Sequence, residues 1–471
     1  MSKRKIKKQK AETRKNRVGD LAVYQRTVHA LHDLCFEDAL RPPIACIREM
    51  IVGSDVCFRR ELRHQGQATL PSNLPVPPCF NDSQMHAASL ALSEPLSIVQ
   101  GAPGTGKTGL AAFILKCWEV VFSDVLGLLA TSFTNTAVDN IAMGLKEKKQ
   151  LNVIRAGHTS KMCRELHWNA LAPGSEGLQQ MRSPHVLCAT ALSDMCGPLD
   201  RLWPLVLVDE TALATEPSTL VPLCRGAKMV VLVGDHQQMP PMVSQAGCAA
   251  GLHVSMFERL LNAGAPQTFL NTQYRMHPKL SHFPMQFYSQ ALHNGLSTLS
   301  RKNPSGYPWP NRDIPICVLH VAEPEVADGS SLRNAGEAEM VRVLIRELQA
   351  NGVPLNKKSI AVITTYSGQE VFTRSVTDKK VDVYTIDKSQ GQERDIIILS
   401  MVRSNSEGKL GFICDRRRIN VALTRARNGL IIVCNTHTLA ADKRTWAYYL
   451  DWAKEHHLVR EPGNCYMTED L

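Results

Sequence analysis

The segment GAPGTGKT, residues 101–108, constrains the fold of this chain more than any other part of its sequence. An apolar run ending at Gln100 precedes it, and a helical run from Gly109 to Val121 follows it. Glycines at such a junction let successive backbone N–H groups and a helix N-terminus surround phosphates. Lys107 would then reach the β and γ phosphates, and the hydroxyl of Thr108 would bind magnesium. The alternative is an ordinary glycine-rich turn. The residues predicted to form this phosphate-binding loop are Gly101, Ala102, Pro103, Gly104, Thr105, Gly106, Lys107 and Thr108.

Short apolar runs alternate with helical segments along most of the chain, and this pattern is typical of an α/β fold with a parallel sheet covered by helices. A chain of 471 residues exceeds the size of one hydrophobic core. The runs fall into two groups of about five, so we expect two domains, 79–268 and 269–460. They follow a basic arm and small helical region, 1–78, and precede a tail, 461–471. We expect residues 295–333 to form a loop with at most one strand. The predicted strands are Ser97–Gln100, Val125–Thr131, His185–Ala189, Leu205–Val208, Met229–Val233, Ile316–Val321, Ser359–Thr364, Val381–Ile386, Asp395–Met401 and Leu430–Cys434.

The net charge of +10 is concentrated at the N-terminus, where residues 1–17 hold nine basic side chains and one acidic side chain. The rest of the chain is therefore nearly neutral, and its charge does not identify a partner. The basic arm is typical of a solvated segment, with nuclear localisation and non-specific phosphate contact as alternatives. No apolar run approaches the roughly 20 residues that span a bilayer. We expect no membrane association and a location in the nucleus, the cytoplasm or both.

The 14 cysteines include no C-x-x-C pair and no cluster at metal-binding spacing, which favours buried, reduced thiols. Acidic residues instead end an apolar run at WPLVLVDE. We interpret Asp209 as a magnesium ligand and Glu210 as the base that accepts a proton from the attacking water. The alternative is a solvated strand end. Gln238 follows the next run, KMVVLVGD, where its amide would contact the γ phosphate and that water; a simple turn is the alternative.

Eight ordered segments between about residues 80 and 435 resemble the superfamily 1 helicases of the branch that contains the nonsense-mediated-decay helicase. The resemblance implies a tandem of RecA-like P-loop NTPase domains, ATP and Mg²⁺ as cofactors, and 5′ to 3′ movement. Two departures are a short interval before Asp209 and the lack of a cysteine/histidine regulatory domain. The segments are FNDSQ (80–84), GAPGTGKT (101–108), ATSFTNTAVDN (130–140), DETA (209–212), GDHQQMPP (234–241), QYRMHP (273–278), TIDKSQGQERD (385–395) and RRINVALTRAR (417–427).

The same resemblance implies roles for single residues in the nucleotide site. Gln84 would read the adenine edge, and Tyr274 would stack on the base. Arg275 and Arg425 would act on the γ phosphate as arginine fingers supplied by the second domain. Glu393 would hydrogen-bond the ribose. Without the resemblance, an isolated tyrosine is more often a core residue and a basic run is more often a solvated face.

Four further residues are predicted to contact nucleic acid: Ser132, Thr134, Asn135 and Thr385. Their hydroxyls and amides suit phosphate and sugar contacts. The alternative for the 131–140 segment is a helix N-cap, formed by Asn135 or Thr136. We therefore expect a monomeric, strand-stimulated ATPase that unwinds or moves along single-stranded RNA or DNA, with a regulatory protein as a further partner. An ATP-gated nucleic-acid clamp or adaptor and a P-loop enzyme with a small-molecule substrate are the alternatives.

Overall fold

The computed structural model describes residues 23–32, 34, 45–52, 70–72, 74–123, 125, 127–147, 152–171, 185–193, 202–289, 291–356 and 358–460. The described chain divides into two compact units, which meet in the sequence between Leu270 and Asn271. The short stretches 102–105 and 237–239 group with the second unit. The basic arm 1–17 and the tail 461–471 lie outside the described residues. The proposals for those segments and for localisation stay predictions.

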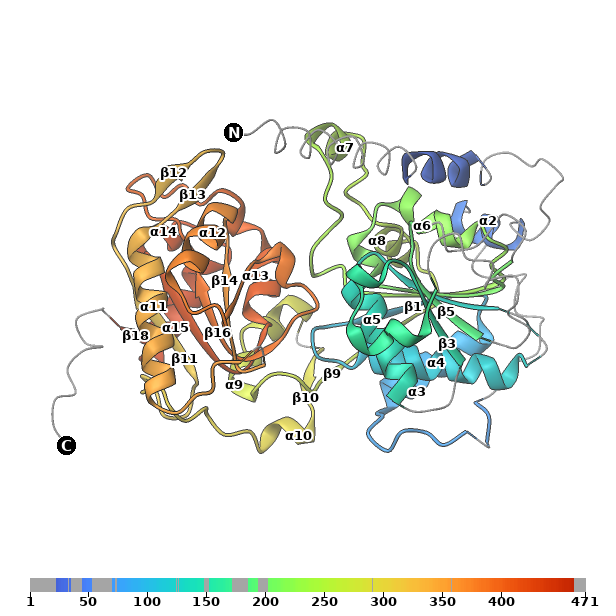
Figure 1. The fold of residues 1–471 in the computed structure, drawn as a ribbon, viewed down its shortest axis with the longest axis horizontal. Coiled ribbons are helices and arrows are strands. Elements are labelled where there is room, and N and C mark those ends of the chain that lie inside the picture. Colours follow the sequence, from blue (N-terminus) through green and yellow to red (C-terminus); the bar gives the residue numbers. More distant parts are fainter. Residues whose placement is uncertain are drawn as a thin grey trace. The chain divides into compact units, whose positions relative to one another are not determined.

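The first unit is built on an eight-stranded sheet, in the order β4-β3-β5-β2-β6-β7-β1-β8, and every neighbouring pair is parallel (Figure 1). The five strands predicted in this half are present, although β2 begins three residues later than expected. β3, β4 and β8 were not predicted. The strands are β1 Leu96–Gly101, β2 Leu128–Ser132, β3 Asn152–Ala156, β4 Ala170–Leu171, β5 His185–Thr190, β6 Leu205–Asp209, β7 Met229–Gly234 and β8 Gln267–Leu270.

Helices flank this sheet, and residues 23–32 and 34 near the start of the chain are also helical. The α-helices are α2 Ala45–Val52, α3 Asp82–Ser93, α4 Lys107–Val121, α5 Asn135–Glu147, α6 Glu216–Leu223, α7 Gln245–Ala249 and α8 Met256–Asn262. The 3₁₀ turns are η3 Thr159–Lys161, η4 Arg164–Asn169 and η7 Thr211–Leu213.

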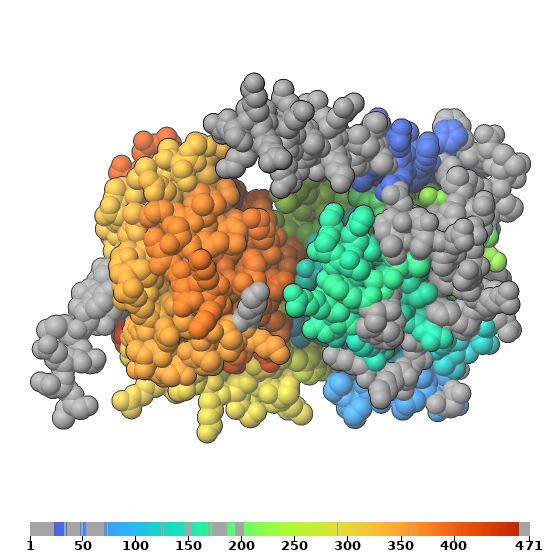
Figure 2. All heavy atoms as spheres, in the orientation of Figure 1, coloured from blue at the N-terminus to red at the C-terminus, as the bar shows by residue number. Residues whose placement is uncertain are grey.

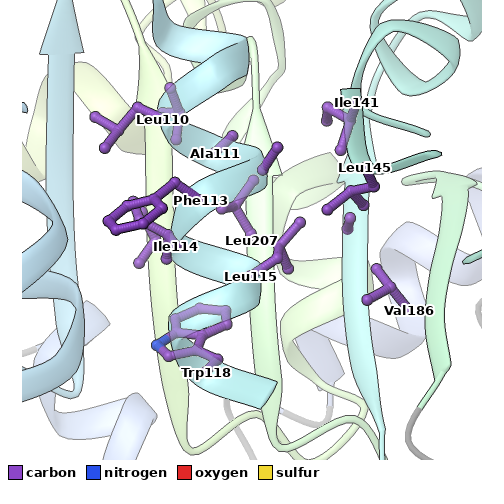
Figure 3. Close-up of a cluster of buried hydrophobic side chains, with 14 of the residues drawn as sticks. Leu110, Ala111, Phe113, Ile114, Leu115, Trp118, Ile141, Leu145, Val186 and Leu207 are labelled. Carbon is purple, nitrogen blue, oxygen red and sulfur yellow. The ribbon is translucent and has the colours of Figure 1, made fainter. Parts of the chain in front are cut away.

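Helix α4 is apolar along most of its length and is buried in the core of the first unit. Figure 3 shows Leu110, Phe113 and Ile114 on this helix, among side chains from α5 and the strands behind it. Trp118 is completely buried and its indole N–H donates to the Ala91 carbonyl at 2.9 Å. Because each large apolar side chain contributes about 1.5–3 kcal/mol when buried, this packing fixes α4 on the sheet. The loop that precedes α4 is therefore anchored at both ends.

The second unit is built on a six-stranded parallel sheet, in the order β15-β14-β16-β17-β11-β18. The five predicted strands are again present, and the short β18 was not predicted. Together the two parallel sheets confirm the predicted fold class, α/β with tandem RecA-like domains. The strands of this sheet are β11 Ile316–His320, β14 Ile360–Thr364, β15 Asp382–Thr385, β16 Arg394–Ser400, β17 Ala426–Cys434 and β18 Val459–Arg460.

The prediction of at most one strand within residues 295–333 is wrong. Besides β11, this region contains an antiparallel hairpin of β12, Val326–Asp328, and β13, Ser331–Arg333. All three residues of β12 are exposed, so the hairpin lacks the alternation of apolar and polar residues that identifies a half-buried strand. Gly329 lies at its turn with a φ of +62°. A second short pair, β9 Thr272–Gln273 and β10 His293–Asn294, is parallel.

The α-helices of the second unit include α11 Ala335–Ala350 and α12 Ser367–Val376, which pack against each other. Figure 2 shows them side by side on the face of this unit, in yellow-orange and orange. Within the described residues, no helix combines the length and apolar character needed to cross a membrane. The remaining helices and turns are α9 Pro278–Ser281, α10 Leu296–Leu299, α13 Arg416–Leu423, α14 Thr436–Leu439, α15 Trp446–Glu455, η8 Pro284–Tyr288, η9 Asp387–Ser389 and η10 Gly411–Cys414.

Candidate functional site

The predicted phosphate-binding loop connects β1 to α4. Gly106 is the N-cap of α4 and has a φ of +80°, a conformation that side chains other than glycine rarely adopt. A Cβ on Gly106 would lie 2.8 Å from Nε2 of Gln84, so the space also excludes a side chain. The ammonium of Lys107 donates to the Gly101 carbonyl at 2.6 Å. Lys107 therefore lies over the loop, at the start of the helix.

Strand β6 delivers Asp209 and Glu210 to the carboxyl end of the same sheet. Asp209 is 3% exposed, and one of its oxygens accepts the backbone N–H of Glu210 at 2.9 Å. Burial and the charge of Glu210 raise the pKa of Asp209 to about 7, while the nearby Lys107 ammonium opposes this shift. Glu210 has a left-handed backbone with a φ of +53°. The structure thus brings Lys107, Asp209 and Glu210 together in the first unit.

Ser132 lies next to Asp209 across the β2–β6 pair. Its side chain is completely buried, and its hydroxyl has no hydrogen-bond partner within the described residues. Leaving a buried hydroxyl unpaired costs about 1–3 kcal/mol, so such groups usually mark an absent ligand, ion or water. Ser132 has no exposed surface in this conformation and is in register with Asp209 on the neighbouring strand, and its contact with nucleic acid stays a prediction.

The capping box of α3 positions Gln84. Its side-chain oxygen accepts the backbone N–H of Asn81 at 3.0 Å, and the Asn81 side chain accepts the backbone N–H of Gln84 at 3.0 Å. Gln84 is 3% exposed, and its amide nitrogen lies beside Gly106 of the phosphate-binding loop. Gln238 is also buried, after the end of β7. Contact of Gln84 with adenine and of Gln238 with the γ phosphate stay predictions.

Two predicted arginine fingers, Arg275 and Arg425, lie close to Thr424 in the second unit. Arg275 donates to the Thr424 carbonyl at 3.1 Å and to the Glu393 carboxylate at 2.5 Å. Arg425 is 2% exposed and donates to the Thr424 hydroxyl at 3.0 Å and to the Val421 carbonyl at 2.9 Å. The second unit therefore gathers three of the predicted site residues, Arg275, Arg425 and Glu393, in one hydrogen-bonded cluster.

Glu393 is paired with cations on two sides. Besides Arg275, the guanidinium of Arg427 lies 3.6 Å from its carboxylate. Burial alone would raise the pKa of Glu393, but Arg275 and Arg427 outweigh burial and lower it. Glu393 is thus a charged partner that holds Arg275 in place. Arg427 is not among the residues predicted from the sequence, although it lies within the RRINVALTRAR segment.

Tyr274 lies over the backbone of Gly295. A Cβ on Gly295 would come within 2.4 Å of two ring carbons of Tyr274, so only glycine leaves room for the ring there. The carbonyl of Tyr274 accepts a hydrogen bond from Arg301 at 3.1 Å, and Arg301 also donates to Asn428 at 3.0 Å. The position of this aromatic ring is therefore fixed from the backbone side. Its stacking on a base stays a prediction.

Two models described as AAA domain match the chain, one over residues 79–172 and 178–246 and the other over residues 252–437. The ATP-dependent helicase NAM7 of Saccharomyces cerevisiae is 36% identical over an alignment of 414 residues that covers 77% of this chain and 42% of that protein. The Regulator of nonsense transcripts 1 homolog of Drosophila melanogaster is 34% identical over an alignment of 448 residues that covers 84% of this chain and 37% of that protein. This chain belongs to the superfamily 1 helicases of the nonsense-mediated-decay branch.

This chain spans less than half the length of these two relatives. Among solved structures, the Arterivirus nonstructural protein 10 helicase matches with a TM-score of 0.42 and 16% identity, over 74% of this chain and 62% of that chain. The fold assignment rests on the two parallel sheets described above and not on that likeness.

Three of the residues predicted to contact nucleic acid, Thr134, Asn135 and Thr385, make hydrogen bonds within the chain. The hydroxyl of Thr134 accepts the backbone N–H of Ala137 at 3.1 Å and so caps α5, a role that the alternative interpretation gave to Asn135 or Thr136. The Asn135 side chain instead accepts a hydrogen bond from Arg155 at 3.0 Å. Thr385 ends β15 and lies 3.4 Å from the backbone N–H of Lys388. Their contact with a strand stays a prediction.

Proposed function

We propose that this chain is an ATP-dependent helicase or translocase that moves along single-stranded RNA or DNA. The observation that carries the proposal is the cluster of Lys107, Asp209 and Glu210 beside a glycine-rich loop at one end of a parallel sheet. Relatives of which this chain covers part are named ATP-dependent helicase. Movement from 5′ to 3′ is part of the proposal and comes from the resemblance to that branch.

The residues present fit ATP and magnesium as cofactors. Asp209 is a buried carboxylate at the loop, and carboxylate and hydroxyl oxygens are the ligands that magnesium prefers. A bound cation would stabilise the charged form of Asp209, which burial otherwise disfavours. Thr108 and Asp209 would hold Mg²⁺, which neutralises phosphate charge when bound. Gln84 and Tyr274 would hold the adenine and Glu393 the ribose.

Hydrolysis would use the predicted site residues in distinct roles. The loop N–H groups and Lys107 would bind the phosphates, and Glu210 would accept the proton of the attacking water, oriented by Gln238. Arg275 and Arg425 would offset the charge that develops on the γ phosphate. Because the arginines bind only while that phosphate is present, hydrolysis would change the preferred arrangement of the chain and so produce a step along the strand.

The proposal is tested by ATP turnover with and without single-stranded RNA and DNA across a salt series. We expect strand-stimulated turnover that weakens as salt rises, because phosphate contacts release counterions. Lys107→Ala should lower turnover by about 100-fold or more, since it removes a charge that stabilises the transition state. Lys228→Ala is the matched control, because Lys228 is exposed and precedes β7, at the opposite end of the sheet. Equal turnover in the two variants would refute the proposal.

A strand-displacement assay with the same protein separates the alternatives. Displacement that requires ATP supports a helicase. Strand-stimulated ATP turnover without displacement or directional movement would indicate the ATP-gated clamp or adaptor. Turnover that is indifferent to every polynucleotide would indicate a P-loop enzyme with a small-molecule substrate. Monomeric state and a regulatory protein partner are further parts of the proposal, and light scattering with the purified chain tests the first of them.

A further inference from the structure

The second unit contains a pocket that the nucleotide site does not use. Its volume is about 690 Å³, within the range of pockets that hold small ligands. Three segments that are distant in the sequence form its walls: η8, the stretch from η10 to the start of α13, and the start of α15. α13 and α15 are labelled in Figure 1. We refer to it as the arginine–aromatic pocket, after the side chains that line it.

Three arginines line the arginine–aromatic pocket, and two of them have little ionic compensation. Arg416 is exposed, has no ion-pair partner in the part of the chain that the structure describes, and lies over the Phe287 ring at 5.0 Å. The Arg444 side chain is 82% exposed, and its nearest carboxylate, Asp442, is 3.9 Å away. Arg418 is paired with Asp387 and Asp415. The pocket therefore presents positive charge to solvent and suits an anionic ligand.

Exposed aromatic rings stand beside these arginines. Tyr448 is 65% exposed and Phe412 is 39% exposed, although a folded chain usually buries such rings. Arg418 lies over the Phe412 ring at 5.1 Å. Proteins that bind single strands without sequence preference combine cations for the backbone with aromatic rings on which bases stack. Two chemical features of such a site thus occur in one pocket.

A side chain of the pocket also contacts the turn that follows β15, the strand that ends at Thr385, a residue predicted to contact nucleic acid. Arg418 bonds Asp387 at 3.2 Å, and Asp387 begins the turn directly after β15, which ends at Thr385. On the other side, the Phe412 ring packs on Tyr366, the N-cap of α12, with ring centroids 4.6 Å apart. The arginine–aromatic pocket is therefore continuous with the loops that follow β14 and β15 in the same sheet.

We propose that the arginine–aromatic pocket binds one or two nucleotides of the single strand, with a base stacked on Tyr448 and phosphates held by Arg444 and Arg416. This inference rests on the proposed function and adds a binding site to it. An acidic peptide would also meet positive charge here, but it would leave the flat, exposed rings without a specific partner. Nucleotides match both features, and the contact of Arg418 with Asp387, two residues after Thr385, favours the strand as the occupant.

Equilibrium binding of short, fluorescently labelled oligouridine and oligothymidine to the full chain tests the proposal. Tyr448→Ala should weaken binding by roughly tenfold, because base stacking on an aromatic ring is lost. Tyr448→Phe should bind as the wild type does, since stacking needs the ring and not the hydroxyl. Arg444→Ala should weaken binding severalfold and lower the slope of log affinity against log salt by about 0.7, the value for one phosphate contact of a single strand. Tyr448→Ala should leave that slope unchanged.

Lys443→Ala is the matched control. It removes the same charge one residue away, from an exposed side chain that does not line the pocket. Its affinity should stay within about twofold of the wild type, because a single charge outside the contact surface is screened at physiological salt. Thermal unfolding of all variants checks the fold, and the high exposure of Arg444 and Tyr448 predicts unchanged melting.

The outcomes separate this inference from the proposed function. A wild-type chain that binds no single strand refutes both. A second outcome refutes only the pocket. In it, the wild-type chain binds the oligonucleotides and hydrolyses ATP, and the oligonucleotide affinities of Tyr448→Ala and Arg444→Ala equal that of Lys443→Ala. A photoreactive thiouridine strand gives an independent measurement: crosslinks to the peptide that contains Tyr448 support the pocket, and crosslinks confined to other peptides overturn it.

Discussion

A buried carboxyl group with a raised pKa lies near the carboxyl end of each parallel sheet, Asp209 in the first unit and Glu337 in the second, and the two groups have different neighbours. Asp209 in the first unit lies beside Glu210, a second acid, and opposite the unpaired hydroxyl of Ser132. Glu337 in the second unit accepts hydrogen bonds from the Ser400 hydroxyl at 2.6 Å and from the Val402 backbone N–H at 2.9 Å. Burial raises both pKa values, to about 7 for Asp209 and to about 8 for Glu337.

The neighbours of Glu337 are those of a carboxyl group that serves the fold, whereas the neighbours of Asp209 fit its proposed role as a magnesium ligand. Hydrogen-bond donors surround Glu337, and it joins α11 to the end of β16. Asp209 has a like charge beside it and an unsatisfied hydroxyl across from it, an arrangement that stabilises the chain poorly without a cation. Strongly shifted pKa values occur at functional sites and in structural networks alike, so the neighbours decide between the two cases.

The largest expected effect is on catalysis at Asp209. Asp209→Asn should lower ATP turnover by about 100-fold, because a magnesium ligand is lost. The same change should stabilise the ligand-free chain at neutral pH. Since the folded pKa is raised from 3.8 to about 7, the free energy of unfolding of the wild type falls as pH rises through that range, and the asparagine variant should lose this dependence. Turnover assays and urea unfolding at several pH values measure the two effects; unchanged turnover would remove Asp209 from the site.

Glu337→Gln should change the pH dependence of stability but leave ATP turnover nearly unchanged. The folded pKa is raised from 4.5 to about 8, so the wild type should lose about 2 kcal/mol or more of unfolding free energy as pH rises through this window. The glutamine variant should show a flatter profile, and its ATP turnover should stay within about twofold of the wild type. Glu339→Gln, an exposed neighbour on α11, is the control: Arg342 lowers the pKa of Glu339, so this change should act on the profile below pH 4.5 and leave the fall between pH 4.5 and about 8 in place. A large loss of turnover in Glu337→Gln would contradict the distinction between the two carboxyl groups.

The smallest expected effect concerns Thr134, which caps a helix and is also predicted to contact the strand. Thr134→Ala should lower the free energy of unfolding by about 1 kcal/mol, because the cap of α5 is lost. Thr134→Asp should keep the cap and repel phosphates, so it should retain stability and weaken binding to oligouridine. If Thr134→Asp binds the strand as tightly as the wild type, Thr134 is a cap only.

Much of the fold was predictable because its central strands are continuous apolar runs. β1, β6 and β7 are buried on both faces and stand out from the helices around them. β4 and β18 have two residues each, too few to form a pattern. The exposed hairpin of β12 and β13 has no buried face, and its strands pair through backbone groups that any sequence provides.

The candidate site divides in the same way. The phosphate-binding loop and Asp209 were predictable because a strand end and the residues after it are adjacent in the sequence. The arginine–aromatic pocket was not predicted, because it joins residues near 283, 412 and 444 that only the tertiary structure brings together. The pairing of Glu393 with Arg275 spans 118 positions and was not predicted either. The resemblance implies a ribose contact for Glu393, and the structure shows in addition that Glu393 is the ion-pair partner of Arg275.

The bare backbone of Gly295 has a practical consequence for the aromatic ring above it. The Tyr274 ring can lie this close to the backbone only because Gly295 has no side chain. A single methyl group at position 295 would tilt or lift the ring while leaving its identity, its hydroxyl and every neighbouring charge in place. If Tyr274 stacks on a base as predicted, nucleotide selectivity would be open to adjustment through Gly295, a residue that would never touch the nucleotide.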